Sequence, residues 1–129
     1  MIIKSNKVLL FIEPKNNKSE KPVIDDLTIK MFLILKRNVD NVGTVMHKGY
    51  FAPGIGTMGL HECVCGATSH SCDYLLDGII ATNWLCVHYL AYHRDEIPKE
   101  EIEKLNQLKN NDVMTENDLP LLEKCMLRI

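Results

Sequence analysis

Hydrophobic residues recur along this chain at two different spacings, one typical of helices and the other of strands. In residues 25–37, apolar side chains three and four positions apart follow acidic residues, and Lys36 and Arg37 end the segment. Such spacing places the apolar side chains on one helix face, and the charges complement the helix dipole. The sequence predicts four helices of this kind, near residues 25–37, 84–95, 98–109 and 118–127.

Shorter apolar runs between turn-forming residues predict strands. The first run lies near residues 7–12, and the second lies near residues 57–65, where alternation would place Cys63 and Cys65 on one face. A third segment, 73–81, is predicted to be a hairpin. It holds an Asp-Gly pair between two apolar runs, and this pair tolerates the positive φ angles of a type I′ turn.

These elements predict an α+β fold, with a small antiparallel sheet packed against three to four helices in a single domain over residues 1–129. A chain of 129 residues is long enough to bury a hydrophobic core without disulfides or metal ions. Within the domain, residues 61–94 hold four of the five cysteines, four of the five histidines and the only tryptophan. This Cys/His-rich central segment is predicted to form a pocket.

Composition and charge narrow the range of partners. The formal net charge is -2, so there is no overall basic field and a nucleic acid is not expected as a partner. The longest charge-free run falls short of the ~20 apolar residues of a membrane span, so a membrane partner is not expected either. The N-terminal segment shows no export signal, which predicts a cytoplasmic protein whose partner is a small ligand or another protein. In that reducing compartment, cysteines are expected as thiols or metal ligands rather than disulfides.

The stretch Cys63-Val64-Cys65-Gly66 resembles a shortened zinc knuckle, in which two thiolates flank a tight turn. Structural zinc sites normally separate such cysteines by two residues or more, whereas one residue separates these two. On an extended strand their Cα atoms would lie about 6.6 Å apart, so one ion could bridge them only if the chain bends. Zinc is the predicted cofactor, and its predicted ligands are Cys63, Cys65, Cys72 and His88.

The helical ligand of this predicted site comes from the second predicted helix, Trp84–Arg94. On a regular helix that turns about 100° per residue, His88 and His93 point about 140° apart and are not natural ligands of one ion. His88 is therefore the preferred helical ligand, with Cys86 as the alternative, and His93 stays outside the predicted set. The predicted site lies between this helix and the Cys63–Cys65 strand.

The favoured function is a small cytosolic metal- or ligand-binding module, and two alternatives remain open. The first is a cysteine–histidine hydrolase or transferase with Cys65 as the nucleophile, His88 as the base and Asp73 as the acid that orients the imidazole. The second is a protein-interaction adaptor or inhibitor without a chemical site, in which the cysteines only pack. Cys86 and Cys125 are expected in the core, because cysteine is among the most buried residue types.

Overall fold

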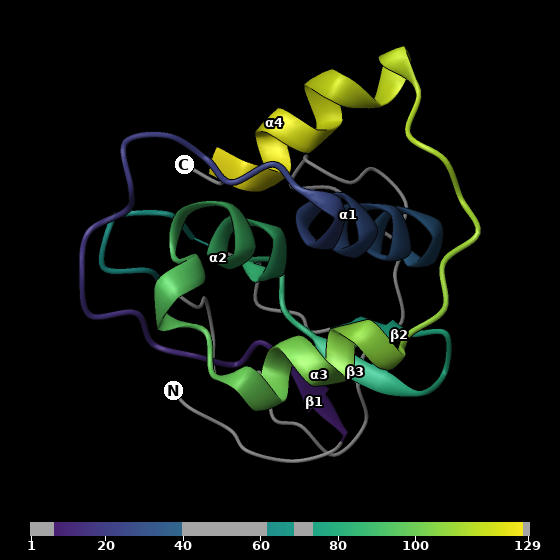
Figure 1. The fold of residues 1–129 in the computed structure, drawn as a ribbon, viewed down its shortest axis with the longest axis horizontal. Coiled ribbons are helices and arrows are strands. Elements are labelled where there is room, and N and C mark those ends of the chain that lie inside the picture. Colours follow the sequence, from purple (N-terminus) through teal and green to yellow (C-terminus); the bar gives the residue numbers. More distant parts are fainter. Residues whose placement is uncertain (1–6, 40–61, 69–73, 128–129) are drawn as a thin grey trace.

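Four helices and one small sheet make up the part of the chain that the computed structural model describes, residues 7–39, 62–68 and 74–127 (Figure 1). The helices are α1 (Asp26–Asn38), α2 (Cys86–Tyr92), α3 (Lys99–Gln107) and α4 (Leu119–Leu127). The strands are β1 (Val8–Leu9), β2 (Tyr74–Leu76) and β3 (Ile80–Thr82). Two short 3-10 helices, η1 (Arg94–Glu96) and η2 (Glu116–Asp118), precede α3 and α4. The predicted α+β class, with a small sheet and four helices, is confirmed.

The sheet has the strand order β1-β3-β2 and contains one strand pair of each kind. β2 and β3 form an antiparallel hairpin, whereas β1 runs parallel to β3 and pairs Val8 with Ala81. The prediction of a purely antiparallel sheet is therefore wrong. Parallel neighbours need a long crossover connection, and the chain between β1 and β3 provides one that includes α1.

The turn between β2 and β3 is the one that the Asp77-Gly78 pair predicts. Both residues have positive φ angles, 52° and 72°, and the Ile79 N–H donates to the Leu76 carbonyl at 2.9 Å. From the end of α1, Arg37 Nε donates to Asp77 Oδ1 at 3.1 Å. A terminal nitrogen of Arg37 donates to the other oxygen of the same carboxylate. Hydrogen bonding by Arg37 is the main reason that the pKa of Asp77 lies below its usual range, and it anchors the turn to α1.

Arg94 joins the end of α2 to the start of α1. Its Nε donates to the Leu90 carbonyl at 3.1 Å, and its two terminal nitrogens donate to the Asp25 carboxylate at 2.8 and 2.7 Å. Asp25 is also the N-cap of α1 and accepts the Thr28 N–H at 3.2 Å. The hydrogen bonds from Arg94 are the main reason that the pKa of Asp25 falls to about 2. This fork fixes the point at which the chain leaves α2, next to His93.

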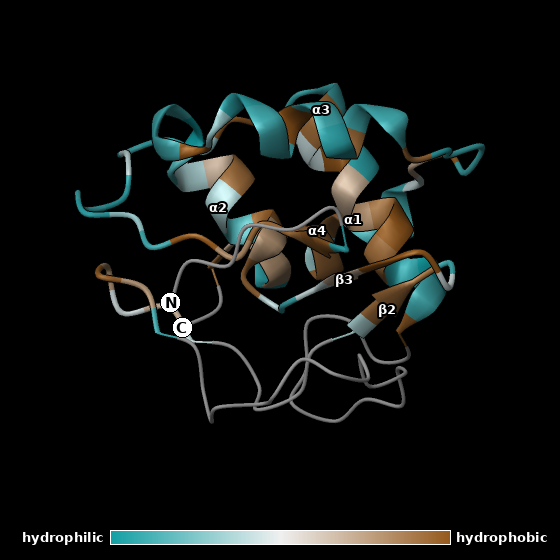
Figure 2. Cartoon of the chain, turned by 90° about the horizontal axis from the view of Figure 1, so that it is seen from below, coloured by the Kyte–Doolittle hydropathy of each residue, from teal (hydrophilic) through white to brown (hydrophobic). Residues whose placement is uncertain are grey.

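The core is shared by the helices and the sheet. α1, α2 and α4 pack against one another, α1 contacts β2, and α3 contacts β1. In Figure 2 the ribbon of α3 is mostly hydrophilic, whereas α1 carries many hydrophobic residues, and those from Met31 to Leu35 are buried. Trp84 and Tyr74 are both buried, with their rings edge to face at a centroid distance of 5.5 Å. α2, which carries His88 and is directly followed by His93, is therefore held by packing on several sides.

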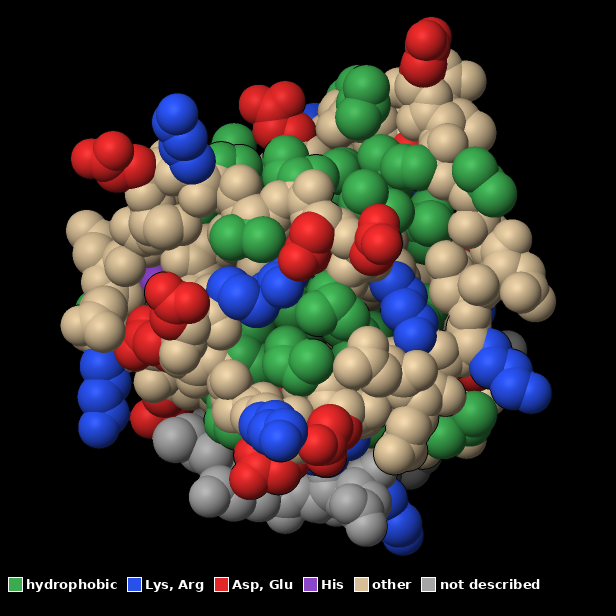
Figure 3. All heavy atoms as spheres, viewed as in Figure 1, with side chains coloured by type: hydrophobic (Ala, Val, Ile, Leu, Met, Phe, Trp, Pro, Cys, Tyr) green, Lys and Arg blue, Asp and Glu red, His purple; other side chains and the backbone are tan. Residues whose placement is uncertain are grey.

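The outer surface carries charges of both signs. On the face in Figure 3, acidic and basic side chains are interspersed around apolar patches rather than gathered by sign, in keeping with the net charge of -2. Across the described ranges, no helix combines the length and the apolar character that crossing a membrane requires.

Replacing Glu101 with alanine is expected to lower the free energy of unfolding by about 2–4 kcal/mol. Glu101 is 6 % exposed, accepts the Leu10 N–H at 2.7 Å and pairs with the Lys104 ammonium at 2.6 Å. Leu10 has a φ of 59°, a left-handed conformation that a non-glycine residue keeps only when its surroundings hold it. Alanine would remove the acceptor and leave Lys104 without its carboxylate.

Denaturant unfolding measures this loss. The matched control is Glu100→Ala, since Glu100 is the exposed neighbour on the same helix, and its effect should stay within about 0.5 kcal/mol. Equal effects of the two substitutions would contradict the role assigned to Glu101.

Candidate metal centre

The two cysteines of the Cys-x-Cys stretch lie on a tight turn. Glu62 and Thr68 form an isolated antiparallel bridge, the Cys63 N–H donates to the Ala67 carbonyl at 2.8 Å, and the Gly66 N–H donates to the Cys63 carbonyl at 2.9 Å. Gly66 closes the turn with a φ of 99°, in a region that favours glycine. The predicted strand is therefore wrong over residues 63–65, Glu62 forms only an isolated bridge, and residues 57–61 lie outside the described part of the chain.

One histidine lies within α2 and the other directly follows it. His88 lies inside the helix and is fully buried, whereas His93 directly follows the last helical residue, Tyr92. The backbone of His93 has φ −131° and ψ 33°, so its side chain does not continue the helical turn. The two imidazole rings lie 5.0 Å apart between centroids. The expectation that they point away from each other is wrong, because it assumed a regular helix through Arg94.

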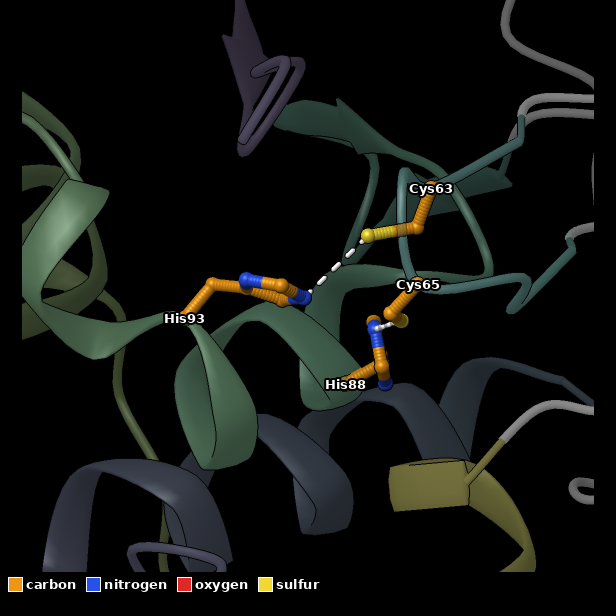
Figure 4. A group of neighbouring side chains, drawn as sticks. All are labelled: Cys63, Cys65, His88 and His93. Atoms are coloured by element: carbon orange, nitrogen blue, oxygen red, sulfur yellow. Dashed lines mark hydrogen bonds between the residues drawn. The ribbon is translucent and has the colours of Figure 1, made fainter. Parts of the chain in front are cut away.

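Cys63, Cys65, His88 and His93 converge on one point (Figure 4). Their four ligand atoms all lie within 4.8 Å of one another. Sγ of Cys63 lies 3.2 Å from Nε2 of His93, and Sγ of Cys65 lies 3.2 Å from Nε2 of His88. Neighbouring ligand atoms around a tetrahedral zinc ion are separated by about 3.4–3.8 Å, given its bond lengths. The cluster therefore has the size and chemistry of a four-coordinate metal site.

A carbonyl and a carboxylate outside the cluster face the outer nitrogens of the two imidazoles. The Met126 carbonyl lies 2.6 Å from Nδ1 of His88, and because a carbonyl only accepts, Nδ1 carries the proton and Nε2 keeps its lone pair. Nδ1 of His93 lies 3.5 Å from Oε2 of Glu96, an arrangement that favours the same tautomer. Such acceptors behind the ring are typical of histidines that bind metals. Both Nε2 atoms are therefore directed toward the thiols.

Burial disfavours the charged forms of Cys63 and His93 when no cation is bound. It raises the pKa of the Cys63 thiol to about 11, an effect to which the neighbouring Cys65 thiol adds. Burial also lowers the pKa of His93 below its usual value, although the Glu96 carboxylate acts in the opposite direction. A divalent cation would reverse the balance at the thiols, because it stabilises thiolates directly.

The site is closed on most sides. Cys63 and His93 are each 3 % exposed, His88 is fully buried, and only Cys65 among the four is half-buried. An ion held here would thus be shielded from solvent except on the side of Cys65. Closed sites with four protein ligands are typical of structural rather than catalytic zinc.

The structure brings together three of the four predicted zinc ligands, Cys63, Cys65 and His88, and adds His93. Cys72, the fourth predicted ligand, lies outside the described residues. The sequence does contain a signal for His93 as a second histidine ligand. Four residues separate it from His88, and structural zinc sites commonly separate paired histidines by three to five residues.

The other cysteines of the described ranges pack in the hydrophobic core. Cys86 and Cys125 are both fully buried and stand outside the cluster, as their expected packing role requires. Cys86, the alternative helical ligand, is therefore not brought to the site.

The predicted catalytic residues are only partly placed. Cys65 and His88 are in contact, at 3.2 Å between Sγ and Nε2. Asp73, the predicted acid, lies outside the described residues. The group that orients His88 in the structure is the Met126 carbonyl, which carries no charge.

Fold and site together define a small α+β protein with a Cys2His2 cluster that could hold a metal ion. Comparison of the chain with family models, curated proteins and solved structures found no match in any of the three. The function is accordingly argued from the geometry of the cluster.

Proposed function

We propose that this protein is a zinc-binding module in which Cys63, Cys65, His88 and His93 hold one structural zinc ion. The observation that carries the proposal is the convergence of four ligand atoms, from two segments far apart in sequence, to within 4.8 Å of one another. Two thiols and two imidazoles form a mixed sulfur and nitrogen set, which suits the borderline-soft Zn²⁺ ion.

A structural role is favoured over a catalytic one. Catalytic zinc sites keep one coordination position for water or substrate and use three protein ligands. Here four candidate ligand atoms lie within 4.8 Å of one another, as many as a four-coordinate ion needs, and three of the four residues are buried. The site therefore leaves little room for a reacting molecule at the metal.

The proposed ion would join three parts of the fold. Cys63 and Cys65 come from the tight turn that Gly66 closes, His88 comes from the first half of α2, and His93 directly follows that helix. Through the Met126 carbonyl, His88 also connects the site to the last turn of α4. An ion that binds only the folded state stabilises that state. Zinc would therefore increase the free energy of unfolding of a domain whose hydrophobic core is already large enough to form by itself.

Elemental analysis tests the proposal directly. Protein purified without a metal-affinity tag is expected to contain one zinc ion per chain, and the Cys63→Ser/Cys65→Ser double variant is expected to contain none. Chelation should lower the melting temperature of the parent protein but not that of the double variant.

A folded parent protein that neither contains nor takes up zinc would overturn the proposal. In that case, rapid alkylation of Cys65 at a pH near 6 would support thiol chemistry with His88 instead, because only a stabilised thiolate reacts fast there. Slow alkylation of every cysteine would support the adaptor alternative.

A further inference from the structure

The N-terminal strap, which we define as residues 15–23, lies across the end of α2. The Ser19 N–H donates to the Tyr92 carbonyl at 3.1 Å, and the Val23 N–H donates to the Ala91 carbonyl at 2.7 Å. The last carbonyls of a helix have no partner within the helix, so the strap satisfies two of them. The strap is thereby fastened to the residues that immediately precede the metal ligand His93.

The side chains of the strap are mostly exposed to solvent. Lys18 lies over the Tyr92 ring at 5.3 Å, and residues of the strap and of η1 together line a cavity of about 220 Å³. The docking of the strap therefore depends largely on a small number of hydrogen bonds. A change in any of these bonds should change the exchange of the strap with solvent.

The Glu96 carboxylate connects the strap with the cluster. Its Oε1 accepts the Lys15 N–H at 2.7 Å and the Asn16 N–H at 3.3 Å. Its Oε2 lies 3.5 Å from Nδ1 of His93, and this nitrogen is buried and makes no hydrogen bond to any described residue at that separation. One carboxylate thus faces both the strap and the back of a ligand ring.

We propose that Glu96 is a positioning residue of the metal centre, which aligns His93 and couples metal binding to docking of the N-terminal strap. The inference rests on the proposed zinc site. A histidine bound to a metal through Nε2 carries its proton on Nδ1, and the cation makes that N–H a stronger donor. The 3.5 Å separation is then expected to shorten into a hydrogen bond, which would hold Glu96 in place for Lys15 and Asn16.

This coupling acts in both directions. If zinc stabilises the docked strap, the docked strap must raise zinc affinity by the same factor, because the two events share one free-energy cycle. Glu96 couples the two events, because its carboxylate faces both the strap and His93. Removing its charge should therefore affect the zinc site and the strap together.

The test compares Glu96→Gln with Asp95→Asn. Gln keeps the shape of the side chain but not its charge, and Asp95 is an exposed acid in the same 3-10 helix, so its substitution makes an identical charge change. Zinc affinity is measured by competition with a chelator, and strap docking by hydrogen exchange of the Lys15, Ser19 and Val23 amides. NMR of the His93 Nδ1 proton reports the hydrogen bond itself.

Three results are expected. Chelation of the zinc-loaded parent protein accelerates exchange of the strap amides. Glu96→Gln weakens zinc affinity by about tenfold, within the range seen when groups behind a metal ligand are lost, and accelerates strap exchange in the zinc-loaded state. The His93 Nδ1 proton resonates further upfield in this variant, whereas Asp95→Asn matches the parent protein in all three measurements.

Two outcomes would overturn the inference. One is strap exchange in the parent protein that does not respond to zinc, a result that requires no variant to fold. The other is a Glu96→Gln protein that equals Asp95→Asn in affinity and exchange. A parent protein that binds no zinc would instead refute the proposed function, and its zinc content is measured first.

Discussion

Replacing His93 with phenylalanine is expected to weaken zinc binding by about a hundredfold to a thousandfold. His93 supplies one of four ligand atoms, and phenylalanine keeps a ring of similar size at a position that is 3 % exposed. Structural zinc ions bind with about 10–16 kcal/mol, so an even division among four ligands assigns about 2.5–4 kcal/mol to each. Competition with a chromophoric chelator measures the change in affinity.

Two cysteine variants make this test specific. Cys86→Ala changes a fully buried cysteine outside the cluster and should leave zinc affinity unchanged. Cys72→Ala removes a ligand that the sequence predicts but that lies outside the described residues, and it should also leave affinity unchanged because four ligands already converge. If Cys72→Ala lost zinc while His93→Phe retained it, the ligand set in the structure would be incorrect.

Features that depend on a few adjacent residues were predictable from the sequence. The Asp77-Gly78 turn forms as predicted because the conformational preference of this pair is local. The direction of β1 relative to β3 could not be predicted from adjacent residues. Val8 pairs with Ala81, and whether such distant segments run parallel depends on how the intervening α1 packs, which no local pattern records.

The site shows the same distinction between local and distant causes. The sequence indicated that the Cys63–Cys65 pair could share an ion only on a bent chain, and Gly66 supplies the bend. A helix that continues through Arg94 would point His93 away from His88. The helix instead ends before His93, where Arg94 binds Asp25 at the start of α1. That contact joins residues 69 positions apart, so helical periodicity could not reveal it.

Zinc affinity is expected to rise by at least about tenfold for each pH unit between about pH 7 and pH 9. The pKa of Cys63 is about 11, so its thiol is protonated throughout this range, and zinc must displace that proton to bind the thiolate. Burial lowers the pKa of His93, so its imidazole is already neutral and does not offset the effect. Calorimetry in two buffers of different ionisation enthalpy should report at least one proton released per zinc ion.

The Cys63 thiol should give the metal-free protein no such gain between pH 7 and pH 9, and should cost it stability above pH 9. This contrast separates metal binding from a general effect of pH on the fold. The folded state holds the Cys63 proton up to a pKa of about 11, whereas the ordinary thiol value is 9.0. The folded chain therefore binds more protons than the unfolded chain between these values, and metal-free stability should decline across that window. With excess zinc, stabilisation should instead grow toward pH 9, by about 1.4 kcal/mol per pH unit where the unfolded chain holds the ion weakly. Parallel slopes with and without zinc would exclude Cys63 as a ligand, because no proton would then be displaced from its sulfur.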